Sequence, residues 1–149
     1  MTGATEPQPG PTAAGGPNNK TPSLSADGLQ ALRRLETTRE VTTVILRLTR
    51  PGGLVLEKEG NLTHDELLRA LPPDEMRLVV HELAFATREG ARRHQRMVIL
   101  WAPPAAAAQE QSYNETFAEL KRFLTGAPVH LRAGRTDQLK YSELVALAG

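Results

Sequence analysis

Apolar residues recur at helical spacing in four parts of the chain. The longest stripe begins at Tyr113 and ends at Leu124, and its members stand four, three and four residues apart, which puts them on one side of a helix. The members of this stripe are Tyr113, Phe117, Leu120 and Leu124. Shorter helices, each with a Ser or Thr ahead of a leucine stripe as a candidate N-cap, are predicted over residues 25–35, 63–71 and 136–147.

Extended patterns separate these helices. Alternating apolar residues predict a strand over residues 41–48, and the turn residues Pro51-Gly52-Gly53 lead into a second strand at 54–57. Two near-continuous apolar runs, Leu78–Phe85 and Met97–Trp101, are typical of central strands covered on both faces. With a last strand at 129–131, the predicted order is helix, two strands, helix, two strands, helix, strand, helix.

The first 23 residues differ in composition from the rest. They hold five of the 11 prolines and four of the 12 glycines and no aromatic residue, so they bury too little apolar surface to offset the entropy lost on ordering. We expect a disordered Pro/Gly-rich leader over residues 1–23 and one folded domain over residues 24–149. For the whole chain, 40% hydrophobic and 23% charged residues are typical of a soluble globular protein.

Charge and cysteine content exclude several classes of protein. No Cys is present, which excludes a disulfide framework and a thiolate nucleophile. A net charge of +1 gives no global attraction to nucleic acid, so none is expected as a partner. The strong local patch is residues 88–96, where four Arg stand against one Glu on a predicted hairpin tip. Without a signal segment or a membrane span, a cytoplasmic location is expected.

Candidate chemistry is sparse. The four histidines fall in different predicted elements without ligand spacing, so no metal site is expected. The serines lack a nucleophile elbow, and Gly52-Gly53 lacks the spacing and lysine of a phosphate loop. No catalytic residue and no cofactor are therefore predicted. The chain is interpreted as a binding module rather than an enzyme, with the arginine-rich tip and the polar helix face as its useful surfaces.

Several motifs in this order resemble the actin-depolymerising-factor homology domain of the cofilin family. They are Leu71-Pro72-Pro73 followed by Arg77, Thr87–Gly90 at the hairpin, Val98–Pro103 with its Trp-x-Pro ending, and a helix with Tyr113 and Leu120 before Thr125-Gly126. The resemblance covers residues 24–149. It implies an α/β fold in which a central mixed sheet of about five strands lies between helices.

The resemblance also implies a function. In this family an exposed helix binds the apolar cleft of an actin subunit beside the N-terminal segment, a basic surface binds the neighbouring filament subunit, and the result is filament disassembly. Actin monomers and filaments are the implied partners of a monomeric protein of the actin cytoskeleton. By position, the first surface would use Ser23, Ser25, Gln109, Glu110, Gln111, Ser112 and Asn114. The filament surface would use Arg88, Arg92, Arg93 and Arg96.

Departures from the cofilin pattern leave alternatives open. Cofilins carry a Lys-x-Lys-Met run before the helix tyrosine, whereas this chain has Ala108–Ser112, so monomer binding is expected to be weaker. Asn61–Leu67 and Thr136–Leu139 resemble the sister subfamily, glia maturation factor, which binds the actin-related-protein branching complex. A coactosin-like filament binder without severing is a further alternative. In a different class, the same arginines would bind phosphoinositide headgroups.

Overall fold

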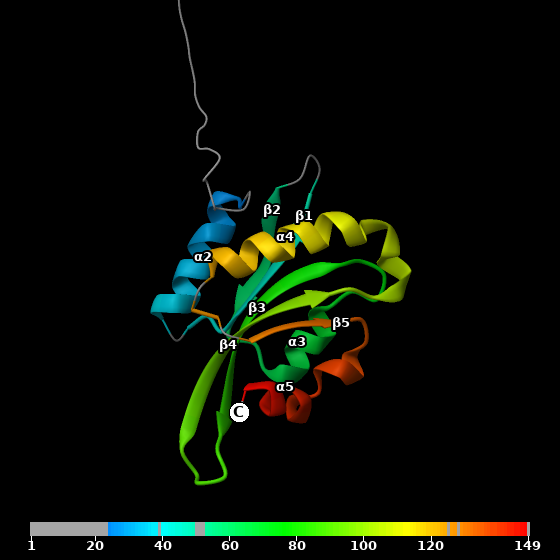
Figure 1. Ribbon diagram of the computed structural model, residues 1–149. Coiled ribbons are helices and arrows are strands. Elements are labelled where there is room, and N and C mark those ends of the chain that lie inside the picture. Colours follow the sequence, from blue (N-terminus) through cyan, green and yellow to red (C-terminus); the bar gives the residue numbers. More distant parts are fainter. Residues whose placement is uncertain (1–23, 39, 50–52, 125, 128, 149) are drawn as a thin grey trace, which may run out of the picture.

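The computed structural model describes residues 24–38, 40–49, 53–124, 126–127 and 129–148, so the predicted leader, residues 1–23, lies outside the described part. A five-stranded sheet in the order β2-β1-β3-β4-β5 forms the centre of the domain (Figure 1). Neighbouring strands are antiparallel except β4 and β5, which run parallel, so the sheet is mixed as expected. The strands are β1 (Thr43–Leu48), β2 (Leu54–Gly60), β3 (Arg77–Ala86), β4 (Arg92–Trp101) and β5 (Val129–Ala133).

Helices cover both faces of this sheet. On one face α2 (Ala26–Thr37) and α4 (Glu110–Phe123) pack against one set of strand side chains, and on the other α3 (His64–Ala70) and α5 (Tyr141–Ala148) pack against the alternate set (Figure 1). Neighbouring residues of β4 show this division, because Val98 belongs to the first core and Ile99 to the second. Met97–Trp101 is buried on both faces as predicted, whereas Leu78–Phe85 is buried on both faces only as far as His81, because Glu82 is half-buried and Ala84 is exposed.

Local signals set the helix starts. Ser25 accepts the Gly28 N–H at 3.0 Å as the N-cap of α2. The N-terminus of α3 carries the full capping box, in which Thr63 accepts the Glu66 N–H at 3.1 Å and Glu66 accepts the Thr63 N–H at 2.7 Å. Each pair satisfies N–H groups that have no partner within the helix. Both caps were predicted from the sequence and are confirmed.

Two helices are preceded by a short 3-10 turn, and the C-terminal one therefore begins later than predicted. After Pro103 the chain first forms a 3-10 turn, η1 (Pro104–Gln109), and α4 starts at Glu110. The C-terminal segment likewise divides into a 3-10 turn, η2 (Thr136–Leu139), and α5, so Thr136 does not cap a continuous helix. Of the leucines predicted to form the buried stripe of this segment, Leu139 and Leu144 are buried, whereas Leu147 is 55% exposed.

The β3–β4 hairpin is longer than the sheet around it. Its strands pair from Arg77↔Trp101 to Ala86↔Arg92, whereas β1 reaches only to His81 and β5 only to Met97. The outer half therefore forms a two-stranded ribbon that projects from the body of the domain (Figure 1). Among the described residues, no helix is long and apolar enough to cross a membrane.

Candidate functional site

Helix α4 presents one face to the core and another to solvent. Tyr113 and Leu120 are buried in the core, while the side chains between them on the other face are exposed. The exposed residues in the first turns are Gln111, Ser112, Asn114 and Glu115. The predicted contact residues Gln111, Ser112 and Asn114 are thus accessible to a partner.

Tyr113 fixes this helix to the end of the sheet. Its hydroxyl accepts the Leu48 N–H at 2.8 Å, and burial raises the pKa of the hydroxyl while this hydrogen bond opposes the rise. Leu48 pairs with Leu54 of β2, whose carbonyl accepts the Ser25 N–H at 2.8 Å. The start of α2 and the first turns of α4 therefore meet at the same end of strands β1 and β2, although 88 positions separate Ser25 from Tyr113.

Ser25 and Gln109, two residues assigned to this surface, already have partners in the structure. The Ser25 hydroxyl caps α2. Gln109 precedes α4, and its amide oxygen accepts the Met76 N–H at 2.9 Å, so this side chain ties η1 to the start of β3. The other N-terminal candidate, Ser23, lies outside the described residues.

Arg77, the first residue of β3, is a buried cation with two carboxylate partners. Its side chain is 8% exposed and binds Glu57 through Nε at 3.0 Å and Glu75 through Nη1 at 2.9 Å. Buried Arg requires such partners because an unpaired charge is costly to desolvate. The arginine of the predicted Leu-Pro-Pro motif thus joins the start of β3 to β2 across the intervening strand β1.

Glu110 and Asn114 are joined by Arg132, which is not among the residues predicted for either surface. Arg132 of β5 donates from Nη2 to the Glu110 carboxylate at 2.7 Å and from Nη1 to the Asn114 amide oxygen at 2.8 Å. Because side chains alternate along a strand, the sequence indicates that Arg132 lies on the opposite side of β5 from Val129 and Leu131. That this side faces α4 depends on the parallel pairing of β5 with β4, which no local pattern specifies.

The four arginines of the filament candidate do not share one surface. Arg88 lies in the turn, while the other three lie on β4, so the predicted placement of the whole patch on the hairpin tip is wrong. Side chains alternate along a strand, so Arg92 and Arg96 follow Val98 on the α2/α4 face, and Arg93 follows Met97 on the α3/α5 face. The register of ten residue pairs in this hairpin is uninterrupted.

The arginines also differ in their freedom to bind a partner. Glu82 lies opposite Arg96 and approaches its Nε at 3.5 Å and His94 Nδ1 at 3.4 Å. The Arg96 side chain is only 25% exposed. Arg88, Arg92 and Arg93 are exposed. Arg96 is therefore less accessible than the other three.

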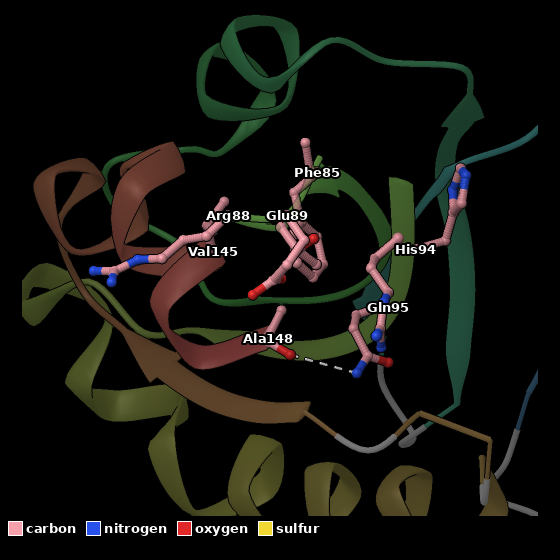
Figure 2. A pocket seen from close by; sticks show the side chains of 10 residues that line it. Phe85, Arg88, Glu89, His94, Gln95, Val145 and Ala148 are labelled. Atoms are coloured by element: carbon pink, nitrogen blue, oxygen red, sulfur yellow. Dashed lines mark hydrogen bonds between the residues drawn. The ribbon is translucent and has the colours of Figure 1, made fainter. Parts of the chain in front are cut away.

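A hollow of about 630 Å³ separates the outer hairpin from α5. Its lining combines apolar Phe85 and Val145 with the cationic Arg88 and Arg93. Figure 2 shows Val145 and Ala148 on the α5 side and Gln95 on the β4 side, where the Gln95 amide reaches the Ala148 carbonyl at 3.5 Å. Arg93 and α5 thus lie on the same face of the ribbon and line this hollow, whereas Arg92 lies on the other face.

A metal site does not form in the described part of the chain. No group of three or more His, Asp or Glu side chains there is placed to hold an ion. His81 is buried beneath α3, with Nδ1 at 2.8 Å from the Thr43 hydroxyl, and burial together with nearby His64 lowers the pKa of His81 to about 4. This histidine is a neutral core residue at physiological pH.

Comparison with known proteins decides the family. Residues 23–147 match the family model described as cofilin/tropomyosin-type actin-binding protein. The chain belongs to this family. The resemblance of its motifs to the cofilin pattern and the α/β fold expected from that resemblance are both confirmed.

Curated relatives and solved structures agree with this assignment. Actophorin of Entamoeba histolytica is 33% identical over 97 residues, which cover 62% of this chain and 69% of actophorin. Actin-depolymerizing factor 3 of Arabidopsis thaliana is 31% identical over 83 residues, 54% of this chain and 60% of the relative. A Streptomyces griseoflavus cofilin structure has a TM-score of 0.75 at 23% identity and covers 85% of this chain and 98% of that one. The structure of coactosin from Entamoeba histolytica has a TM-score of 0.72 at 19% identity and covers 85% of this chain and 94% of that one.

Proposed function

We propose that this protein binds actin through the exposed face of α4 and the adjoining start of α2, and through the β3–β4 ribbon. The single observation that carries this is the division of α4, whose Tyr113 and Leu120 are buried while Gln111, Ser112 and Asn114 stay accessible, in a chain of an actin-binding family. Because the apolar side of α4 is packed in its own core, the face that it offers a partner is polar and suits binding through hydrogen bonds and charge. The hydrogen bonds of Tyr113 and Gln109 pre-organise it, which lowers the entropy lost on binding.

Binding of this kind breaks no covalent bond. The protein promotes filament disassembly if it binds more tightly to a strained arrangement of actin subunits than to the relaxed filament, because a ligand shifts an equilibrium only through such a difference. The relatives named actophorin and actin-depolymerizing factor support this choice of partner and outcome. The conformational change resides in actin, and this chain supplies a rigid two-part surface.

The helix surface is tested by adding one negative charge at its centre. Ser112→Glu is expected to weaken binding to monomeric actin about tenfold, because the acidic surface of actin repels the added carboxylate. Ser142→Glu, at an exposed position of α5 on the opposite face of the sheet, is the matched control and is expected to bind like wild type. Titration of fluorescent monomeric actin measures both. Equal weakening by the two variants would contradict the assignment of this surface.

The filament surface is tested by two neighbouring arginines on opposite faces of the ribbon. Arg92→Glu and Arg93→Glu make the same charge change at adjacent positions, so co-sedimentation with filaments identifies the face that contacts actin. We expect Arg93→Glu to reduce pelleting more, because Arg93 lies with Arg88 beside the hollow next to α5. Pelleting by wild type and both variants alike would remove the ribbon from the binding surface. Binding of the branching complex or of phosphoinositide vesicles, without binding to actin, would overturn the proposed function.

A further inference from the structure

The sequence of α4 gives its exposed face an excess of negative charge. Its first three turns carry Glu110, Glu115 and Glu119, and no Lys or Arg occurs in the helix before Lys121. Such a face repels an acidic partner, and actin is acidic. Since the proposed function places actin here, the structure must supply a cation from elsewhere or binding through this surface is opposed.

That cation is Arg132. It stands on β5, the edge strand of the sheet, opposite buried Leu100 of β4, and its side chain crosses to the first turns of α4. The guanidinium donates to Glu110 and Asn114, which stand four residues apart and so lie on one side of the helix. Its side chain remains 45% exposed.

We propose that Arg132 is the partner-contacting cation of the helix surface, held in place by Glu110 and Asn114. This inference rests on the proposed function and adds a residue from a different element to it. A guanidinium has five N–H donors, of which these two hydrogen bonds use one on each terminal nitrogen. Within the described part of the chain the other donors have no hydrogen-bond partner, and they suit a carboxylate on an acidic protein surface, to which Arg binds in bidentate fashion.

The alternative is that Arg132 serves only to tie β5 to α4. An ion pair this exposed contributes little to folding stability, and α4 is already fixed by the buried Tyr113 hydroxyl and by Gln109. Glu110 also changes its role under the proposal. It orients Arg132 and neutralises part of its charge instead of contacting the partner itself.

The two explanations differ in what they predict for replacement of each partner of the ion pair. If Arg132 contacts actin, Arg132→Gln weakens binding to monomeric actin about tenfold and reduces the dependence of binding on salt, whereas Glu110→Gln strengthens binding about twofold to fivefold by removing an anion. If the pair is only a tether, both variants weaken binding or neither does. Arg69→Gln, an exposed position on α3 across the sheet, is the matched control for loss of one positive charge.

The experiment is a titration of fluorescent monomeric actin with full-length protein at low and at physiological salt, with thermal unfolding of each variant as the folding control. Opposite signs for Arg132→Gln and Glu110→Gln, with Arg69→Gln unchanged, support the proposal. Wild-type affinity in Arg132→Gln, or the same sign in both variants, overturns it while the proposed function stands. If wild type binds neither monomer nor filament, the proposed function fails and this inference fails with it.

Discussion

The hydroxyl of Tyr113 accepts the backbone N–H of Leu48 at 2.8 Å, which links the first turn of α4 to the end of strand β1. We expect Tyr113→Phe to lower the free energy of unfolding by about 1–2 kcal/mol, because the Leu48 N–H loses its partner where water reaches it poorly. Chemical denaturation measures this loss.

Tyr141→Phe provides the matched control. The Tyr141 hydroxyl donates to the Ala84 carbonyl at 2.9 Å, but Tyr141 is 45% exposed, so water can replace the lost donor. Its loss of stability is expected to be smaller than that of Tyr113→Phe. A larger loss in Tyr141→Phe would mean that the Tyr113 hydrogen bond does not anchor α4.

The N-cap of α2 gives a second prediction. Ser25→Ala is expected to destabilise the protein by about 1 kcal/mol, because the Gly28 N–H loses the oxygen that caps it. Ser25→Asp is expected to stay close to wild type, since Asp caps well and its charge favours a helix N-terminus. Thermal unfolding of the three proteins decides, and equal losses in both variants would assign Ser25 some other structural role.

Stability should depend on pH through His81. Burial lowers the pKa of His81 in the folded protein to about 4 from a usual value of 6.5. Between these values the unfolded chain binds a proton that the folded chain does not, so stability is complete above about pH 6.5 and falls as the pH approaches 4, by about 3 kcal/mol in all.

Replacement of this histidine isolates its share of the pH dependence. His81→Gln keeps a group that can hydrogen-bond Thr43 and is expected to flatten the unfolding free energy between pH 6.5 and 4 relative to wild type. His130→Gln exchanges an exposed histidine on β5 and is expected to retain the wild-type profile. Urea unfolding at several pH values measures both, and an unchanged slope in His81→Gln would rule out His81 as the cause.

Two glycines should differ sharply in their tolerance of alanine. A Cβ at Gly134 would stand 2.6 Å from the Ala102 carbonyl oxygen, a backbone atom that cannot move without disturbing the β4–β5 pairing. A Cβ at Gly126 would meet the end of the flexible Arg96 side chain at 3.3 Å. We expect Gly134→Ala to cost about 1–3 kcal/mol and Gly126→Ala to change stability by less than about 0.5 kcal/mol, both measured by chemical denaturation. Similar losses at the two sites would contradict this packing.

Much of the fold could be predicted because its signals are local. Apolar spacing identified each helix and strand, and the hydroxyls of Ser25 and Thr63 identified two helix starts, since capping needs only residues within one turn. The split of the C-terminal segment at Lys140 could not be read, because a 3-10 turn and an α-helix present similar apolar spacing over a few residues. The α4 candidates Gln111, Ser112 and Asn114 came from the resemblance to the cofilin pattern, and all three are exposed in the structure.

The sequence by itself determined the elements, their order and the amphipathic face of α4, because helix and strand periods act between residues a few positions apart. Only the tertiary structure decided that Arg132 lies against Glu110, that Gln109 is tied to Met76 and that Arg93 rather than Arg92 shares a face of the ribbon with α5. Those relationships depend on strand order and register, which are set by burial of the whole core and not by any local pattern.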